Sequence, residues 1–239
     1  MPDKRTIVLT KKPKNPIIIE GFPGFGLVGT IATGFLSDHL KCEKIGTHYF
    51  DEIAPTIAVH DCKTVDPISI YYCKKYNIVI IHSILPPTGI EWKAADIVLD
   101  IANQLNAKEI ITTEGVGSGE QTEESRGFYY SNNPKTAEKM KKMGIDCLGE
   151  GIIVGVTGAL LLKSTFPLTC VFAETHSHLP DSKAAAKIIE TLDKYLSLDV
   201  DYRPLLKQAE AFESKLKTIV QQTAKVQDLK AKKETSYIS

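Results

Sequence analysis

The sequence predicts an α/β fold with a mostly parallel, doubly wound sheet, and three observations support this prediction. Strand-like and helix-like segments alternate between residues 17 and 174, an order typical of parallel sheets covered by helices on both faces. The segment at 78–82 is a continuous β-branched run, as in a strand buried on both faces. The chain of 239 residues is also long enough to bury a sizeable core.

The first half of the chain supplies most of the expected strands. A strand at 17–20 leads through a glycine turn into a helix at 27–40. Short β-rich segments follow at 44–50, 56–60, 68–73 and 78–82.

The second half continues the alternation. A helix is expected at 93–105, because its apolar residues form one stripe at helical spacing: Ala94, Ile97, Val98, Ile101 and Leu105. The remaining elements are a strand at 110–114, a helix at 135–143, a strand at 152–154, a helix at 159–162 and a strand at 169–174.

A different pattern begins after Pro204. Apolar or small residues recur at alternating steps of four and three, at Leu205, Ala209, Phe212, Leu216, Ile219, Thr223 and Val226. This stripe predicts either an amphipathic helix lying on its own domain or a seam between copies, with Leu205, Phe212, Leu216 and Ile219 as its packing positions. We therefore divide the chain into an α/β core at 1–203, an amphipathic helix at 204–230 and a flexible tail at 231–239.

Composition excludes some partner classes. Lys plus Arg and Asp plus Glu number 29 each, so no global basic field recruits nucleic acid or anionic lipid, and association between copies is less opposed by repulsion. No apolar run reaches the roughly 20 residues of a membrane helix. The five cysteines are dispersed, which favours reduced, buried thiols in a cytoplasmic protein over a disulfide framework.

The segment at 15–35 contains Gly24-x-Gly26-x-x-Gly29 between a strand and a helix, the order of a dinucleotide-binding loop. The acidic pair Asp51 and Glu52 follows the next strand-like segment, where a ribose-binding carboxylate would lie. Against a cofactor, Phe22, Pro23 and Phe25 crowd the turn, and Pro23 removes an amide donor. The favoured interpretation is a turn that serves packing, and we expect no cofactor.

Other motifs are weaker. The loop at 114–126 combines glycines with several glutamates, which favours a surface at the carboxyl end of the sheet over a phosphate cradle. The pair His176 and His178 has metal-type ligands beside it, but a polar loop is the favoured interpretation and we expect no metal. No nucleophile motif occurs, although Ser83, Ser118 and Ser125 are present. The sequence therefore does not point to a reaction.

Four stretches taken in order, EGFPGFGLVG, LPPTGIEWKAADIVLDIA, EGVGSGE and AETHSHLPDSKAAAKII, resemble the archaeal branch of the proteasome assembly chaperone 2 family. The resemblance spans residues 17–196. It implies a homo-oligomeric domain shaped like nucleoside phosphorylases, whose glycine turn, crowded by Phe and Pro, shapes a strand–helix junction. An older label for the family, ATP-grasp or carboxylate–amine ligase-like, would require ATP-binding residues that the resemblance does not supply.

Some members of this family dock on the α-subunit ring through a tail that ends in a hydrophobic residue, a tyrosine and any residue. Here the chain ends Ser236, Tyr237, Ile238, Ser239, so the tyrosine stands third from the end. The residues expected to bind the partner are Tyr237, Ile238 and Ser239, and a frayed terminus without a role is the alternative.

The resemblance thus implies a non-catalytic, cytoplasmic chaperone that assists assembly of the proteasome core particle by binding its subunits. The rival hypothesis is an enzyme, ATP-grasp-like or nucleoside-phosphorylase-like, with a small ligand at the carboxyl edge of the sheet. Its expected pocket comprises Gly24, Gly26, Gly29, Glu91, Glu114 and Gly117. A third hypothesis is an oligomeric scaffold for another client.

Overall fold

The computed structural model describes residues 7–60, 62–117, 125–176, 179–206 and 218. Their centre is an eight-stranded sheet in the order β2-β5-β6-β1-β7-β10-β8-β9. Its strands are β1 (Ile17–Gly21), β2 (Glu43–His48), β5 (Ile68–Cys73), β6 (Ile78–Ser83), β7 (Glu109–Gly117), β8 (Gly127–Ser131), β9 (Asp146–Cys147) and β10 (Leu168–Thr175). A separate hairpin is formed by β3 (Ala58–His60) and β4 (Lys63–Val65).

The middle of the sheet is parallel and its edges are mixed. The strands β6, β1, β7 and β10 run parallel to one another. On one side β5 pairs antiparallel with β6, and β2 antiparallel with β5. On the other side β8 pairs antiparallel with β10. The protein is therefore a mixed α/β fold with a large, mostly parallel central sheet.

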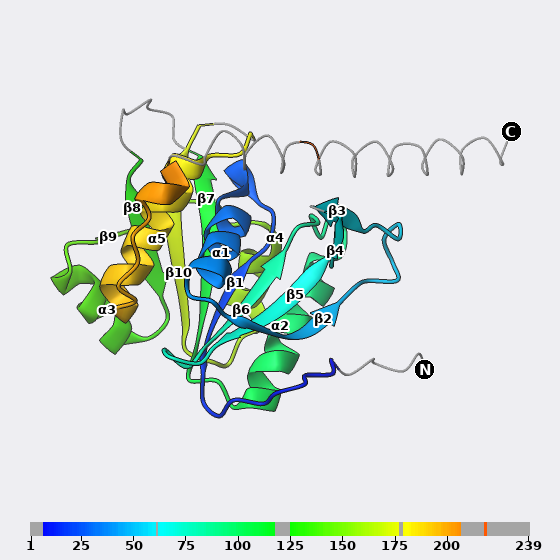
Figure 1. Ribbon diagram of the computed structural model, residues 1–239. Coiled ribbons are helices and arrows are strands. Elements are labelled where there is room, and N and C mark those ends of the chain that lie inside the picture. The colour runs from blue at the N-terminus through cyan, green and yellow to red at the C-terminus, as the bar shows by residue number, and fades with distance from the viewer. Residues whose placement is uncertain (1–6, 61, 118–124, 177–178, 207–217, 219–239) are drawn as a thin grey trace, which may run out of the picture.

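Helices cover both faces of the sheet. In Figure 1, α1 (Val28–His39) and α5 (Ser182–Leu196) lie in front of the sheet, while α2 (Glu91–Leu105) and α4 (Gly155–Lys163) lie behind it. The short helix α3 (Pro134–Lys142) lies beside β8, and Asn133 caps it by accepting a hydrogen bond from the Lys135 amide.

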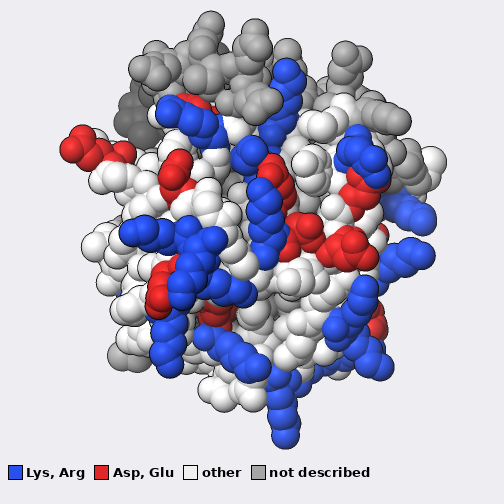
Figure 2. All heavy atoms as spheres, turned by 90° about the vertical axis from the view of Figure 1, so that its left-hand side faces the viewer, with Lys and Arg blue, Asp and Glu red and all other residues white. Residues whose placement is uncertain are grey.

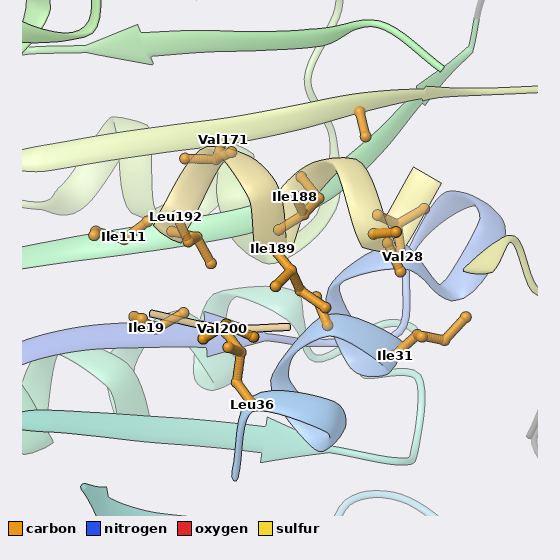
Figure 3. Close-up of a cluster of buried hydrophobic side chains, with 14 of the residues drawn as sticks. Ile19, Val28, Ile31, Leu36, Ile111, Val171, Ile188, Ile189, Leu192 and Val200 are labelled. Carbon is orange, nitrogen blue, oxygen red and sulfur yellow. The ribbon is translucent and has the colours of Figure 1, made fainter. Parts of the chain in front are cut away.

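Each face of the sheet has its own apolar core. On the front face Ile19, Ile111 and Val171 of three neighbouring strands point at the helices, as Figure 3 shows. Residues of α1 and α5 meet them and one another there: Val28, Ile31, Leu36, Ile188, Ile189 and Leu192. On the rear face, Ile18 and Ile110 pack against apolar residues of α2 and α4. Strands buried on both faces are largely apolar, which is why their sequences lack a regular alternation.

Most predicted elements are present, and the strand predicted at 152–154 is wrong. Ile152 and Val154 are 92% and 69% exposed in an irregular segment that leads into α4. Gly151 and Gly155 flank the segment, and glycine at both ends favours a loop over a strand. Several elements were not foreseen: β4, β8, β9 and α5.

The prediction about cysteines is also wrong. Cys42 and Cys73 form a disulfide, with their Cα atoms 4.3 Å apart. Cys42 follows α1 and Cys73 ends β5, so the fold joins two positions separated by 31 residues. Of the three free cysteines, Cys62 and Cys147 are exposed and Cys170 is buried. The dispersed spacing therefore did not indicate reduced, buried thiols.

Although the net charge is zero, charged side chains of both signs are spread over the surface. Figure 2 views the molecule from the side on which α3 and α5 lie, and blue Lys and Arg side chains spread over that face with red carboxylates among them. Some of these charges are paired, since Glu190 of α5 accepts hydrogen bonds from both Lys187 and Lys194. Among the described residues, no helix has the length and apolar character needed to span a bilayer.

Little of the C-terminal stripe lies within the described part of the chain. Leu205 is 3% exposed and joins the front core, as the amphipathic-helix interpretation requires of that position. Phe212, Leu216 and Ile219 lie outside the described residues, as do Tyr237, Ile238 and Ser239.

Candidate functional site

The glycine motif forms a tight junction between β1 and α1. A 3-10 turn at Phe25–Leu27 precedes the helix, and Gly26 within it has a φ of 66°, a conformation that favours glycine. A Cβ atom added at Gly26 would lie 2.8 Å from Oγ1 of Thr175. Gly26 is therefore required both for the backbone turn and for the close approach of β10.

Gly29 lets α1 approach the sheet at backbone distance. A Cβ atom at Gly29 would lie 2.2 Å from the carbonyl oxygen of Thr113 in β7, and one at Gly21 would lie 2.3 Å from the carbonyl oxygen of Gly29. Such contacts leave no room for side chains. The motif resembles a cofactor loop in spacing, but Gly26 and Gly29 are occupied in packing.

The acidic pair expected to hold a ribose lies elsewhere. β2 is the edge strand, separated from β1 by β5 and β6, so Asp51 and Glu52 do not follow the strand next to the glycine turn. Glu52 instead accepts a hydrogen bond from Lys93 of α2 at 2.6 Å, which lowers the pKa of its carboxyl group. This arrangement differs from that of a dinucleotide fold.

A cleft of about 760 Å³ opens at the carboxyl ends of β1, β7 and β10. This position is where ligands of open α/β sheets usually bind. One wall comes from residues 22–25, a second from residues 86–88 with Glu91, and a third from residues 148–157. The floor is formed by side chains near the carboxyl ends of the strands: Glu20, Glu114, Phe172 and Glu174.

Two floor carboxyl groups, Glu20 and Glu114, lie on neighbouring strands and share the rear face of the sheet. Glu20 is 1% exposed, and burial together with the negative charge of Glu114 raises its pKa well above the ordinary value. Burial raises the pKa of Glu114 to about 7, and a hydrogen bond with Thr157 opposes the shift. The negative charge of Glu114 therefore disfavours ionisation of Glu20.

The third floor carboxylate, Glu174, is paired. Arg126 donates to it from Nε at 3.0 Å and from Nη2 at 2.9 Å, and the Arg126 guanidinium lies 5.6 Å from the ring centre of Phe128. Glu174 is 2% exposed in its side chain, whereas Arg126 is 53% exposed. The pair fixes a positive group at the mouth of the cleft and neutralises one floor charge.

The cleft unites four of the six residues predicted for a ligand pocket. Gly24, Glu91, Glu114 and Gly117 all line it. Gly24 touches the floor, since a Cβ atom there would lie 2.8 Å from Oε1 of Glu114. Gly26 and Gly29 do not line the cleft and serve packing instead.

Sequence reasoning missed Glu20, Arg126 and the wall at 148–157, and it considered Glu174 only as a metal-type ligand beside His176. Glu20 stands at the end of an apolar strand, and a lone acidic residue in such a strand is a signal that could have identified it. Glu174 is likewise an acidic residue near the end of a largely apolar strand, β10. The loop that ends at Arg126 was expected at this edge, but neither Arg126 nor the wall could be assigned to a cleft, because only the strand order brings β8 and the loop before α4 together there.

The described residues do not bring the candidate histidines and serines together into a metal or catalytic site. His176 is exposed and His178 lies outside the described residues, and in the described ranges no three His, Cys, Asp or Glu side chains are arranged to hold a metal ion. Ser83 and Ser125 donate their hydroxyl protons to backbone carbonyls, and Ser118 lies outside the described residues. The described residues that line the cleft include no Ser, Cys or His.

Comparison with known proteins identifies the family. A model of the PAC2 family matches residues 18–220. Protein MJ0106 of Methanocaldococcus jannaschii is 31% identical over 228 residues, which cover 94% of each chain. The crystal structure of PbaA from Pyrococcus furiosus, described as an archaeal homolog of proteasome-assembly chaperone, is 31% identical with a TM-score of 0.79, over 92% of this chain and 98% of PbaA.

A protein with unknown function from Thermoplasma acidophilum shares the fold, with a TM-score of 0.82 at 24% identity over 92% of each chain. The ATP-grasp label receives no support from these matches. The family model covers most of the chain, and the chain therefore belongs to the PAC2 family.

Proposed function

We propose that this protein is a non-catalytic chaperone that assists assembly of the proteasome core particle by binding its subunits in the cytoplasm. The observation that carries the proposal is the 31% identity to PbaA over 92% of this chain, within the PAC2 family. The cleft agrees with a binding role, because its described lining lacks the Ser, Cys and His side chains on which most nucleophilic catalysis relies.

The proposed client surface is the α-subunit ring, and the proposed contact is the C-terminal tail. A tyrosine offers a large contact area and a hydroxyl group for few frozen torsions, and the terminal carboxylate can pair with a lysine of the ring. Tyr237, Ile238 and Ser239 are the residues that would insert between neighbouring subunits.

Two deletions test the tail. Removal of residues 237–239 is expected to abolish co-purification with α-subunits, and removal of Ser239 alone, which places Tyr237 second from the end, is expected to preserve or strengthen it. Unchanged binding of both variants would contradict tail docking and place the client on the folded body. Loss of binding in both would show that the terminal carboxylate must stand after Ser239.

We also propose that the protein is a homo-oligomer that associates through the stripe from Phe212 to Val226, beyond Leu205, which packs in its own domain. Replacing Phe212 and Leu216 by Asp is expected to yield a folded monomer, because a charge in an apolar seam is not solvated. Light scattering at micromolar concentration measures the mass, and circular dichroism checks the fold. An unfolded variant would assign the stripe to packing on its own domain, and a monomeric parent protein would contradict the oligomer.

One observation favours an enzyme as the second candidate. The cleft lies where α/β enzymes, including the nucleoside phosphorylases that the fold is expected to resemble, bind their ligands, and burial raises the pKa of Glu114 to about 7, as for a general acid or base. A thermal-shift series with ATP, NAD and nucleosides, with and without Mg²⁺, separates the candidates. A ligand at 100 times its Kd adds about 2.7 kcal/mol to the free energy of unfolding. A clear shift with one nucleotide would favour the enzyme.

A further inference from the structure

Acidic side chains outnumber basic ones in the lining of the cleft. The described lining contains five glutamates, Glu20, Glu91, Glu114, Glu150 and Glu174, and one basic side chain, Arg126. Arg126 is already engaged by Glu174 in a two-point ion pair. The remaining carboxyl groups have no basic partner in the lining, and the N-terminal turns of α2 and α4 at the rim offset only part of their charge.

One of these carboxyl groups, Glu20, is almost completely buried. Its Oε2 accepts a hydrogen bond from the Phe22 amide at 3.3 Å. Glu20 is 1% exposed and lines the cleft floor. A buried carboxylate is costly unless it is paired, so a cationic donor supplied by a ligand would stabilise it.

Aromatic side chains also line the cleft. Phe22, Phe25, Phe128 and Phe172 line the cleft, together with Pro86 and Pro87. Aromatic faces attract organic cations and also pack against the aliphatic stem that carries such a charge. A compact metal ion does not fit this lining, since the carboxylates of the described residues are not grouped as ligands of one ion.

We propose that the cleft binds an organic cation, a primary ammonium or guanidinium group on an aliphatic stem, with its charged head between Glu20 and Glu114 and its stem along the phenylalanines. The cleft of about 760 Å³ has room for a ligand of this kind. The chemistry is shared by two sources, a lysine or arginine side chain of a bound protein and a free polyamine. This inference goes beyond the proposed function and does not depend on it.

Isothermal titration calorimetry of the isolated full-length protein at pH 8 tests the proposal. The probes are n-butylammonium, spermidine and N-acetyl-lysine methylamide, and the neutral control is the Nε-acetylated form of the lysine probe. All three cations are expected to bind at least tenfold more tightly than the neutral control. Tighter binding of spermidine would identify a polyamine as the source, and tighter binding of the lysine probe a protein side chain.

Variants locate the binding. Glu20→Gln and Glu114→Gln each keep the shape of the side chain and remove its charge, and each is expected to weaken binding of n-butylammonium at least tenfold. Glu138→Gln, an exposed residue of α3 that pairs with Lys142, is the matched control and leaves binding unchanged. Circular dichroism confirms that each variant is folded.

Three results would overturn the proposal: no heat from any cation at millimolar concentration, equal affinity for the neutral control, or unchanged affinity in both cleft variants. Because the assay contains no proteasome subunit, its failure leaves the proposed function untouched. Failure of subunit binding would likewise leave this result untouched.

Discussion

The replacement Glu114→Gln should change how the stability of the protein depends on pH. Glu114 has an ordinary pKa of 4.5, and burial raises its pKa to about 7 in the folded state. Below pH 4.5 the group is protonated in both the folded and the unfolded chain and contributes no penalty. As the pH rises from 4.5 to 7, the unfolded chain releases the proton first, so the free energy of unfolding falls by about 3 kcal/mol.

A second buried group opposes this trend in the wild-type protein. Burial lowers the pKa of His82 from 6.5 to about 4, so the unfolded chain binds more protons in that window and stability rises with pH. The wild-type profile is therefore not diagnostic. The difference between variant and wild type isolates Glu114, because the contribution of His82 is present in both.

Urea unfolding at intervals from pH 4.5 to pH 8.5 provides the measurement. We expect Glu114→Gln to match the wild type within about 1 kcal/mol at pH 4.5 and to exceed it by about 3 kcal/mol at pH 8. Removing the charge of Glu114 also relieves Glu20, since that charge contributes to the raised pKa of Glu20. Glu138→Gln, exposed on α3, should show a flat difference. A difference for Glu114→Gln that does not grow with pH would refute the reasoning.

Three further changes test the packing described above. Gly29→Ala should lower the free energy of unfolding by about 2 kcal/mol, because its Cβ atom would lie 2.2 Å from a backbone oxygen. The control Gly149→Ala, with nothing within 4 Å of the added Cβ atom, should change it by less than about 0.5 kcal/mol. Equal effects of the two variants in urea unfolding would contradict this packing role of Gly29. Reducing the disulfide between Cys42 and Cys73, or replacing Cys73 by Ser, should lower the free energy of unfolding by about 3 to 4 kcal/mol for a closed loop of this length. Thiol titration of the denatured protein should count three thiols before reduction and five after it. Tyr195→Phe removes a hydroxyl that donates to the buried Glu109 carboxylate at 2.8 Å, and it should lower the free energy of unfolding by about 2 kcal/mol in the same assay. An unchanged midpoint would show that Glu109 finds another donor.

The sequence predicted the central strands and the helices around them because their signals are local. The run at 78–82 reads as a buried strand from its own residues, and the stripe from Ala94 to Leu105 matches the buried side of α2. The segment at 152–154 has an equally apolar sequence and is a loop. The difference is that no strand of the described residues pairs with it, and a partner cannot be read from the segment itself.

The cleft was predictable only in part. Gly24, Glu91, Glu114 and Gly117 stand beside recognisable turns and strand ends, so their place at the carboxyl edge followed from the parallel order. Arg126 reaches the cleft because β8 inserts antiparallel beside β10, an arrangement that no local pattern indicated. The disulfide was not predicted for the same reason, since the approach of Cys42 and Cys73 depends on how α1 packs over the sheet.

The proposed chaperone function requires the protein to bind proteasome subunits. The most direct measurement combines the full-length protein with purified α-subunits from the same organism and determines the masses of the resulting species by native mass spectrometry. We predict a complex of defined stoichiometry that contains both proteins and that is lost when residues 237–239 are removed. Separate masses for a folded protein and folded α-subunits at micromolar concentration would contradict the claim.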